Sequence, residues 1–392
     1  MKNATLCLIV SSLVLFSFGT ASSFAADSST NAIIAYVFAR NRALGPNEVD
    51  AAKLTRINYA FANIQSGQIV AGYSHDRDNF VVLNNLKKVN PQLQILVSVG
   101  GWIWSSSFSD VALTPSSRRI FIDSVVQFLR DNQLDGLDID WEYPASVGNG
   151  NIYRPEDKQN YTALLKELRH RFNREEKALG RRLILSIAAG TSEEFVAKTE
   201  MKQVQRYVDS VNLMSYDYYE SGSDAITGHH APLYANPADP KHASADASVK
   251  LFEQAGVPSR KLILGVPFYG RAWADVGGAG NGLYQPGRKA DMWANYSDIA
   301  GNLLNNGFVR YWDNVSSVPW LYNPDKRVFI SYEDRESILL KCHYVLDHRL
   351  GGVMFWEYTG DTPDHALLEA INDGLVRSQA SDASPATHAA AH

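Results

Sequence analysis

Four carboxylates occupy one ten-residue stretch of the chain, DGLDIDWEYP at residues 135–144. Successive side chains of a strand point to opposite faces, so Asp138, Asp140 and Glu142 share one face while the apolar residues between them share the other. Three ionised carboxylates spaced about 6–7 Å apart along a strand are costly to bury. At least one of them should therefore hold a proton.

Two alternative roles compete with catalysis for these acids. A solvated strand face that is acidic by chance is the simplest, but it does not fit a run whose other half is strongly apolar. A metal site is the stronger rival. A hard cation would want further carboxylates or His, and the neighbouring strand ends supply Tyr, Trp and Met instead. We therefore expect no metal and no organic cofactor.

The elements that must position these acids alternate along the chain. Helical periodicity fills most of the segments between strands, as in 115–133, which follows the cap residue Thr114, and in 155–180, which ends at Gly180. Alternating strands and helices predict an α/β fold with a parallel sheet, and eight such units fit a closed (β/α)8 TIM barrel. The expected strands are 31–38, 54–64, 93–101, 134–143, 182–190, 208–217, 261–270 and 351–358.

The fourth strand would place the acid row inside this barrel, with Glu142 at the C-terminal rim where barrel enzymes keep their active sites. About eighty residues separate the seventh strand from the eighth, whereas a crossover needs only one helix and two short loops. We expect a small α+β insertion at 272–335. Its aromatic residues, Trp320 among them, fit either the wall of a substrate groove or a small core of the insertion itself.

Composition and the chain ends limit the function further. The chain has 392 residues, 45% of them hydrophobic, and a net charge of −5, so no basic excess favours nucleic acid. Residues 1–26 are typical of a signal peptide, because Lys2 precedes an apolar run too short for a membrane span and then small residues. We expect a secreted, extracellular or periplasmic protein with a catalytic domain at 27–377 and a disordered tail at 378–392.

The acid row resembles the DxxDxDxE pattern of glycoside hydrolase family 18, the chitinase family. Other motifs follow in the family's order. The resemblance covers about residues 31–377, and a family member would carry these motifs at the ends of barrel strands three, six, seven and eight. They read SVGG at 98–101 followed by Trp102, MSYD at 214–217, PFYGRAW at 267–273, and Trp356.

Two carboxylates two residues apart on one strand approach a sugar from the same side, so they cannot easily flank its anomeric carbon. The resemblance implies that the attacking group is the substrate's own 2-acetamido oxygen, which forms an oxazolinium ion. Glu142 would then act as general acid and base, and Asp140 would orient the acetamido group. Asp138 would share a proton with Asp140, and Tyr216 would bind the acetamido carbonyl.

The resemblance also implies a set of sugar-binding residues. Trp356 would be the floor under the reacting sugar, because a flat aromatic ring suits the C–H face of a pyranose. Trp102 would serve the leaving-group side, and Tyr36 would support the acids. The remaining residues expected to bind substrate are Asp217, Met214, Tyr269, Arg271, Phe61 and Ser98.

These features predict a retaining hydrolase of β-1,4-linked N-acetylglucosamine in chitin. An endo-β-N-acetylglucosaminidase or peptidoglycan-lytic enzyme would use the same chemistry. An inactive chitin-binding lectin of the same fold is disfavoured because Glu142 is present. We expect a monomer whose partners are chitin or its oligosaccharides, without nucleic acid or membrane.

Overall fold

The computed structural model describes residues 31–292 and 294–377. The predicted signal peptide at 1–26 and tail at 378–392 lie outside the described residues. None of the helices in the described part of the chain has the length and hydrophobicity of a membrane span.

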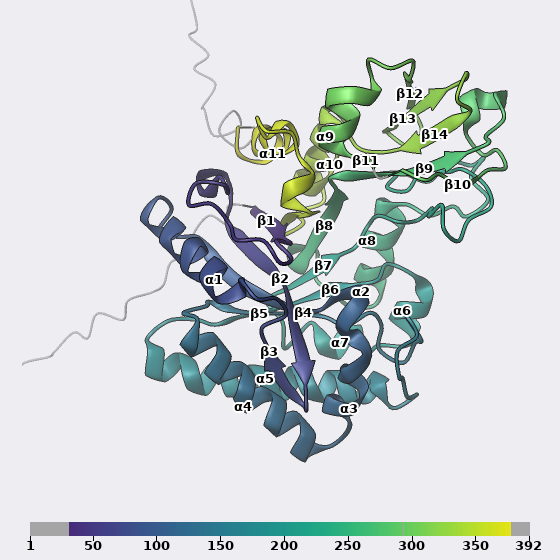
Figure 1. The fold of residues 1–392 in the computed structure, drawn as a ribbon. Helices are drawn as coiled ribbons and strands as arrows, with labels where there is room; N and C mark the ends of the chain where they lie inside the picture. Colours follow the sequence, from purple (N-terminus) through teal and green to yellow (C-terminus); the bar gives the residue numbers. More distant parts are fainter. Residues whose placement is uncertain (1–30, 293, 378–392) are drawn as a thin grey trace, which may run out of the picture. The chain divides into compact units, whose positions relative to one another are not determined.

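Eight parallel strands close into a barrel, which confirms the predicted fold (Figure 1). The ring closes because β1 pairs with β2 on one side and with β15 on the other. A short strand, β3 (Gln68–Val70), extends β2 as an antiparallel hairpin outside the ring. The barrel strands are β1 (Ala32–Val37), β2 (Arg56–Gln65), β4 (Gln94–Gly100), β5 (Gly136–Asp140), β6 (Ile184–Ala189), β7 (Ser210–Leu213), β8 (Leu262–Pro267) and β15 (Gly352–Trp356).

Helices cover the outside of the barrel. One of them begins and another ends at the residues that the sequence predicted. Thr114 caps the first of these, α4, by accepting a hydrogen bond from the Ser117 backbone, and proline occupies its first position. The other, α5, ends at Gly180, whose φ of 66° is the left-handed conformation that glycine allows. The helices are α1 (Asp76–Asn85), α2 (Gly101–Trp104), α3 (Phe108–Leu113), α4 (Pro115–Asp131), α5 (Asp157–Leu179), α6 (Glu193–Ala197), α7 (Met201–Val204), α8 (Ala245–Gln254), α10 (Arg335–Asp347) and α11 (Ala366–Asn372).

The side chains along β5 alternate between the two faces of the strand, as predicted. Leu137, Ile139 and Trp141 are buried in the main core between the strands and the helices. Trp141 stacks on Phe108 of α3 with ring centroids 5.2 Å apart and meets Tyr161 of α5 edge-on. The apolar half of the acid-bearing segment therefore packs outward and leaves the acids facing inward.

An antiparallel sheet is inserted between β8 and β15. We predicted one strand over 261–270, but a bend at Phe268 divides it into β8 and the first strand of the insertion. The boundary was missed because the apolar run continues from one strand into the other. The insertion consequently begins at Tyr269 rather than at the expected residue 272. Its elements are β9 (Tyr269–Ala274), β10 (Arg288–Lys289), β11 (Ala294–Asn295), α9 (Tyr296–Asp298), β12 (Val309–Asp313), β13 (Val318–Asn323) and β14 (Val328–Ser331).

Candidate active site

The acid row rises along β5 toward the C-terminal rim of the barrel. Asp138 is fully buried, Asp140 is 3% exposed and Glu142 is 9% exposed. The strand ends at Asp140, so Glu142 lies two residues beyond it and not within a strand running to residue 143. The three carboxyl groups thus pass from the barrel interior to the edge of solvent.

Asp138 accepts four hydrogen bonds from four other strands. Its Oδ2 accepts from the Tyr36 hydroxyl at 2.9 Å and from the Ser98 hydroxyl at 2.8 Å. Its Oδ1 accepts from the Ser186 hydroxyl at 2.5 Å and from the Asn212 amide at 3.2 Å. Burial raises the pKa of Asp138, while the hydroxyl donors oppose that rise because they favour the carboxylate.

Asp140 has a different environment. Its Oδ1 is buried and has no hydrogen-bond partner among the described residues. Burial, followed by the negative charges of Glu142 and Asp138, raises the pKa of Asp140 well above its ordinary value. No hydrogen bond joins it to Asp138 in this structure, so the shared proton stays a prediction.

Glu142 is held at the rim through its backbone. Its N–H donates to the Ser105 hydroxyl at 2.9 Å, and its carbonyl accepts from the Asn151 amide at 2.9 Å. Burial raises the pKa of Glu142 to about 7, with a smaller upward contribution from the charge of Asp217. A carboxyl group with this pKa can both give and take a proton near neutral pH. The peptide bonds Ala60–Phe61, Glu142–Tyr143 and Trp356–Glu357 are cis.

A cleft of about 1130 Å³ opens above Asp140 and Glu142. Trp356, at the end of β15, lines the cleft and stacks on Phe61, with ring centroids 5.4 Å apart and planes 22° apart. Phe38 and Tyr36 contact the same indole at 5.6 and 5.8 Å. This aromatic support fixes the indole in one orientation beside the acids.

On the insertion side, the cleft is lined by a charged cluster around Asp217. Its carboxylate accepts from the Tyr269 hydroxyl at 2.9 Å and from two nitrogens of Arg271 at 2.7 and 2.6 Å. Burial opposes ionisation of Asp217, but the contacts with His230 and Arg271 outweigh it, so the pKa of Asp217 is lowered. Asp217 therefore carries a full negative charge near Glu142.

The predicted site residues fall into two layers. Asp138 and Ser98 lie below the cleft, where Ser98 serves as a donor to Asp138. Trp102 is half exposed on α2 at the rim. The other predicted residues line the cleft together with Trp102, and these are Tyr36, Phe61, Asp140, Glu142, Met214, Tyr216, Asp217, Tyr269, Arg271 and Trp356.

Sequence reasoning missed several lining residues. Tyr143 and Tyr218 directly follow Glu142 and Asp217, and this adjacency was the signal that could have found them. Tyr73, Trp104 and Lys198 also line the cleft, but they come from loops and helix ends that carry no motif. Such residues are placed by tertiary structure alone.

The fold and this geometry define the class of protein: a (β/α)8-barrel enzyme with acid–base groups in a row on one strand, beneath an aromatic cleft. Residues 29–361 match the sequence profile described as "Glycosyl hydrolases family 18". The chain belongs to glycoside hydrolase family 18.

Relatives of known name are similar over most of the chain. Chitinase A1 of Niallia circulans is 43% identical over 76% of this chain, although the match spans only 45% of that protein. Chitotriosidase-1 of Mus musculus is 32% identical over 79% of this chain and 68% of its own length. A family 18 N-acetylglucosaminidase structure from Paenibacillus barengoltzii is 41% identical with a TM-score of 0.81, and the match covers 88% of this chain and 100% of that one.

Proposed function

We propose that the protein hydrolyses β-1,4 linkages between N-acetylglucosamine units of chitin with retention of configuration. The observation that carries this proposal is the rim position of Glu142, buried with a pKa of about 7, directly above Asp140. The family and its chitinase relatives support the choice of substrate.

The bond-breaking step follows from these positions. Glu142 gives its proton to the glycosidic oxygen as the bond from that oxygen to the anomeric carbon breaks. The acetamido oxygen of the same sugar forms a bond to that carbon, and the positive charge on the resulting oxazolinium ion is stabilised by Asp140. Water then attacks the anomeric carbon and gives a proton back to Glu142, while the bond from that carbon to the acetamido oxygen breaks and the acetamido group is restored. Two inversions at one carbon give net retention.

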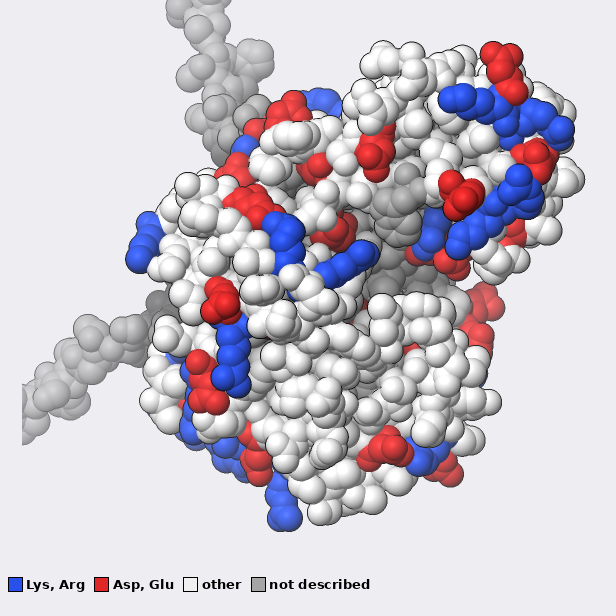
Figure 2. All heavy atoms as spheres, in the orientation of Figure 1, with Lys and Arg blue, Asp and Glu red and all other residues white. Residues whose placement is uncertain are grey.

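Contacts in the cleft support a sugar as the ligand. The stacked indole of Trp356 offers a flat apolar face, and the hydroxyl of Tyr216 and the cluster of Asp217 and Arg271 supply polar groups beside it. Figure 2 shows charged side chains of both signs interspersed on one face of the molecule, with a broad uncharged area between them. A neutral polymer suits such a surface better than a polyanion does.

A second candidate is an N-acetylglucosaminidase that releases single sugars from a chain end. It is favoured by the similarity to the Paenibacillus barengoltzii enzyme, which covers all of that chain. The chemistry at Glu142 would be the same, so the two candidates differ only in which sugar occupies the reacting position.

A product profile tests both candidates. Chitin oligosaccharides, N-linked glycoproteins and peptidoglycan are incubated side by side with the purified protein, and products are separated by mass. The proposal expects short oligosaccharides from chitin oligomers and little release from the other two. Single N-acetylglucosamine units from the first time point would favour the second candidate, and release only from glycoprotein or peptidoglycan would refute the proposal.

We further propose that the protein is secreted, on the strength of the predicted signal peptide at residues 1–26. N-terminal sequencing of protein recovered from the medium or periplasm would give a new terminus close to residue 27. An intact Met1 on the protein inside the cell would contradict this.

A further inference from the structure

A buried arginine lies beneath the acid row. Arg56, the first residue of β2, is 8% exposed. Its Nη1 donates to the Ser210 hydroxyl at 3.1 Å and its Nε to the Gln94 side-chain oxygen at 3.2 Å. Ser210 belongs to β7, which does not neighbour β2 in the sheet, so the guanidinium crosses the barrel interior.

A chain of hydrogen bonds leads from this guanidinium to Asp138. The Ser210 hydroxyl accepts from Arg56 and donates to the Asn212 side-chain oxygen at 3.1 Å. The Asn212 amide donates to the Tyr36 hydroxyl at 3.0 Å and to Asp138 at 3.2 Å. Tyr36 in turn donates to Asp138 at 2.9 Å.

The direction of this chain is set at its base. A guanidinium has donors only and stays charged in proteins, so Ser210 must accept from it. The single hydroxyl proton of Ser210 then points to Asn212, which orients that amide with its nitrogen toward Asp138. Tyr36 already accepts from the Asn212 amide, so its own proton is free for Asp138. Asn212 and Tyr36 therefore both present donors to Asp138.

We propose that Arg56 is a positioning residue for the hydrolysis proposed above, on which this inference rests. By fixing the direction of these hydrogen bonds, it keeps Asp138 as a carboxylate and leaves the proton of the acid row on Asp140. As positive charge develops on the oxazolinium ring, Asp140 passes this proton to the Asp138 carboxylate. Asp140 then faces that charge as a carboxylate.

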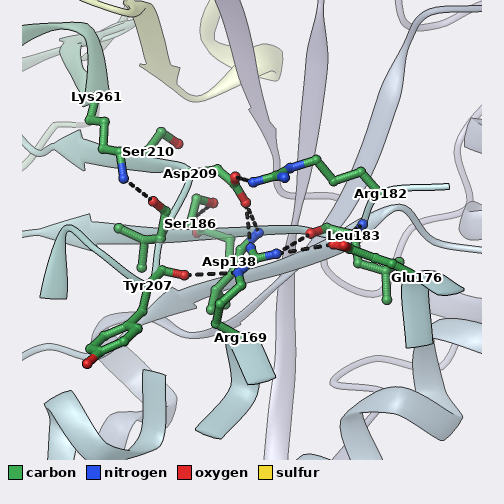
Figure 3. Close-up of polar contacts among 12 residues, drawn as sticks. Asp138, Arg169, Glu176, Arg182, Leu183, Ser186, Tyr207, Asp209, Ser210 and Lys261 are labelled. Carbon is green, nitrogen blue, oxygen red and sulfur yellow. Dashed lines mark hydrogen bonds and ion pairs between the residues drawn. The ribbon is translucent and has the colours of Figure 1, made fainter. Parts of the chain in front are cut away.

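Two carboxylates attract the Arg56 guanidinium, Asp209 first and Asp138 second. Asp209, just before β7, attracts Arg56, but Figure 3 shows its carboxylate held by Arg169 and Arg182. The bond from Arg169 to Asp209 is 2.6 Å long. Lys261 donates its hydrogen bonds to the backbone carbonyls of Gln205 and Val208 rather than to Asp209. The titratable groups that face Asp138 are Tyr36 of β1, Arg56 of β2, Asp140 of β5, Tyr161 of α5 and Tyr216 after β7.

Removing Arg56 should shift the acidic limb of the pH profile of kcat/KM on a chitin oligosaccharide. Arg56 stabilises the Asp138 carboxylate and so lowers the pH at which the acid pair takes up an extra proton. Arg56→Met should therefore raise the acidic midpoint by about one pH unit, as expected for loss of a nearby opposite charge. Arg56→Lys keeps a cationic donor and should restore the midpoint.

Two further variants separate positioning from simple structural damage. Arg118→Met removes a guanidinium of α4 that is 7% exposed and binds Glu167 rather than any residue of the chain of hydrogen bonds, so its acidic midpoint should match the wild type. Ser210→Ala removes one hydroxyl, a change that the barrel should tolerate even if Arg56→Met does not fold. It should raise the midpoint in the same direction.

The outcomes distinguish this inference from the proposed function. A wild-type protein without hydrolysis of chitin oligosaccharides would refute the proposed function. An active wild type, with Ser210→Ala or a folded Arg56→Met showing lower kcat but an unchanged acidic midpoint, would refute the role of Arg56 alone. A shift in Arg118→Met equal to that in Arg56→Met would also refute it, because the loss of any buried arginine would then have the same effect.

Discussion

The barrel interior below the cleft is polar, whereas the inserted sheet is held together by apolar clusters. Barrel interiors are usually filled with branched apolar side chains, yet below this cleft the interior holds Asp138 and its partners in a hydrogen-bonded column. The insertion holds two apolar clusters, one of which contains Trp273, Trp320 and Phe329. It contributes Tyr269 and Arg271, both on β9, to the cleft. The acid row thus lies in the barrel, whereas the insertion uses Trp273, Trp320 and Phe329 in its own core.

The largest effect should come from the barrel side of this comparison. Glu142→Gln keeps the shape of the side chain but removes its transferable proton, so kcat on chitin oligosaccharides should fall about 10²- to 10⁴-fold. Steady-state kinetics with a binding assay in parallel would show the loss in kcat with binding retained. A variant with a tenth of the wild-type rate would show that another group is the acid.

A substitution in the core of the insertion should lower the stability of the protein and leave its catalytic rate unchanged. Trp320 is 7% exposed and stacks on Tyr311 with ring centroids 5.4 Å apart. Trp320→Ala should lower the free energy of unfolding by about 3–5 kcal/mol, as for other buried tryptophans. kcat/KM on short oligosaccharides should hold at temperatures where the variant is folded. Trp312→Ala is the control, since that ring is only partly buried. Loss of activity without loss of stability would place Trp320 at the substrate.

The pH dependence of stability should reveal the cost of burying Glu142. Its pKa is about 7 in the folded protein and 4.5 as an ordinary glutamate, so the folded state binds the proton more tightly. This contribution to stability is complete below pH 4.5 and is lost as pH rises through 7. Relative to Glu142→Gln, the wild type should lose up to about 3 kcal/mol between those limits. Equal pH dependence of chemical denaturation in the two proteins would contradict the raised pKa.

A smaller effect should come from the contact between the two regions. The charge of Asp217 raises the pKa of Glu142, so Asp217→Asn should lower the basic midpoint of the kcat/KM profile, by less than about one pH unit. Tyr269→Phe removes a hydrogen bond to Asp217 but keeps its charge, and should leave that midpoint in place. If both variants move it equally, the hydrogen bond rather than the charge controls Glu142.

The comparison also explains what the sequence could predict. Strand alternation revealed the acid row and the eight-stranded barrel because both are local patterns. Two of the four partners of Asp138, Ser186 and Asn212, could not be found in this way, since they are single polar residues within apolar strands and meet it only when the barrel closes. The bend at Phe268 was missed because no polar residue interrupts the run from the end of β8 into the start of β9.

The measurement that tests the central claim most directly is proton NMR of the reaction with two matched substrates, chitin hexasaccharide and its fully deacetylated form. If the acetamido group is the nucleophile above Asp140, the first product of the acetylated substrate carries the β anomer and the deacetylated substrate is not cleaved. The α anomer as first product, or equal cleavage of both substrates, would contradict substrate-assisted hydrolysis by this acid row.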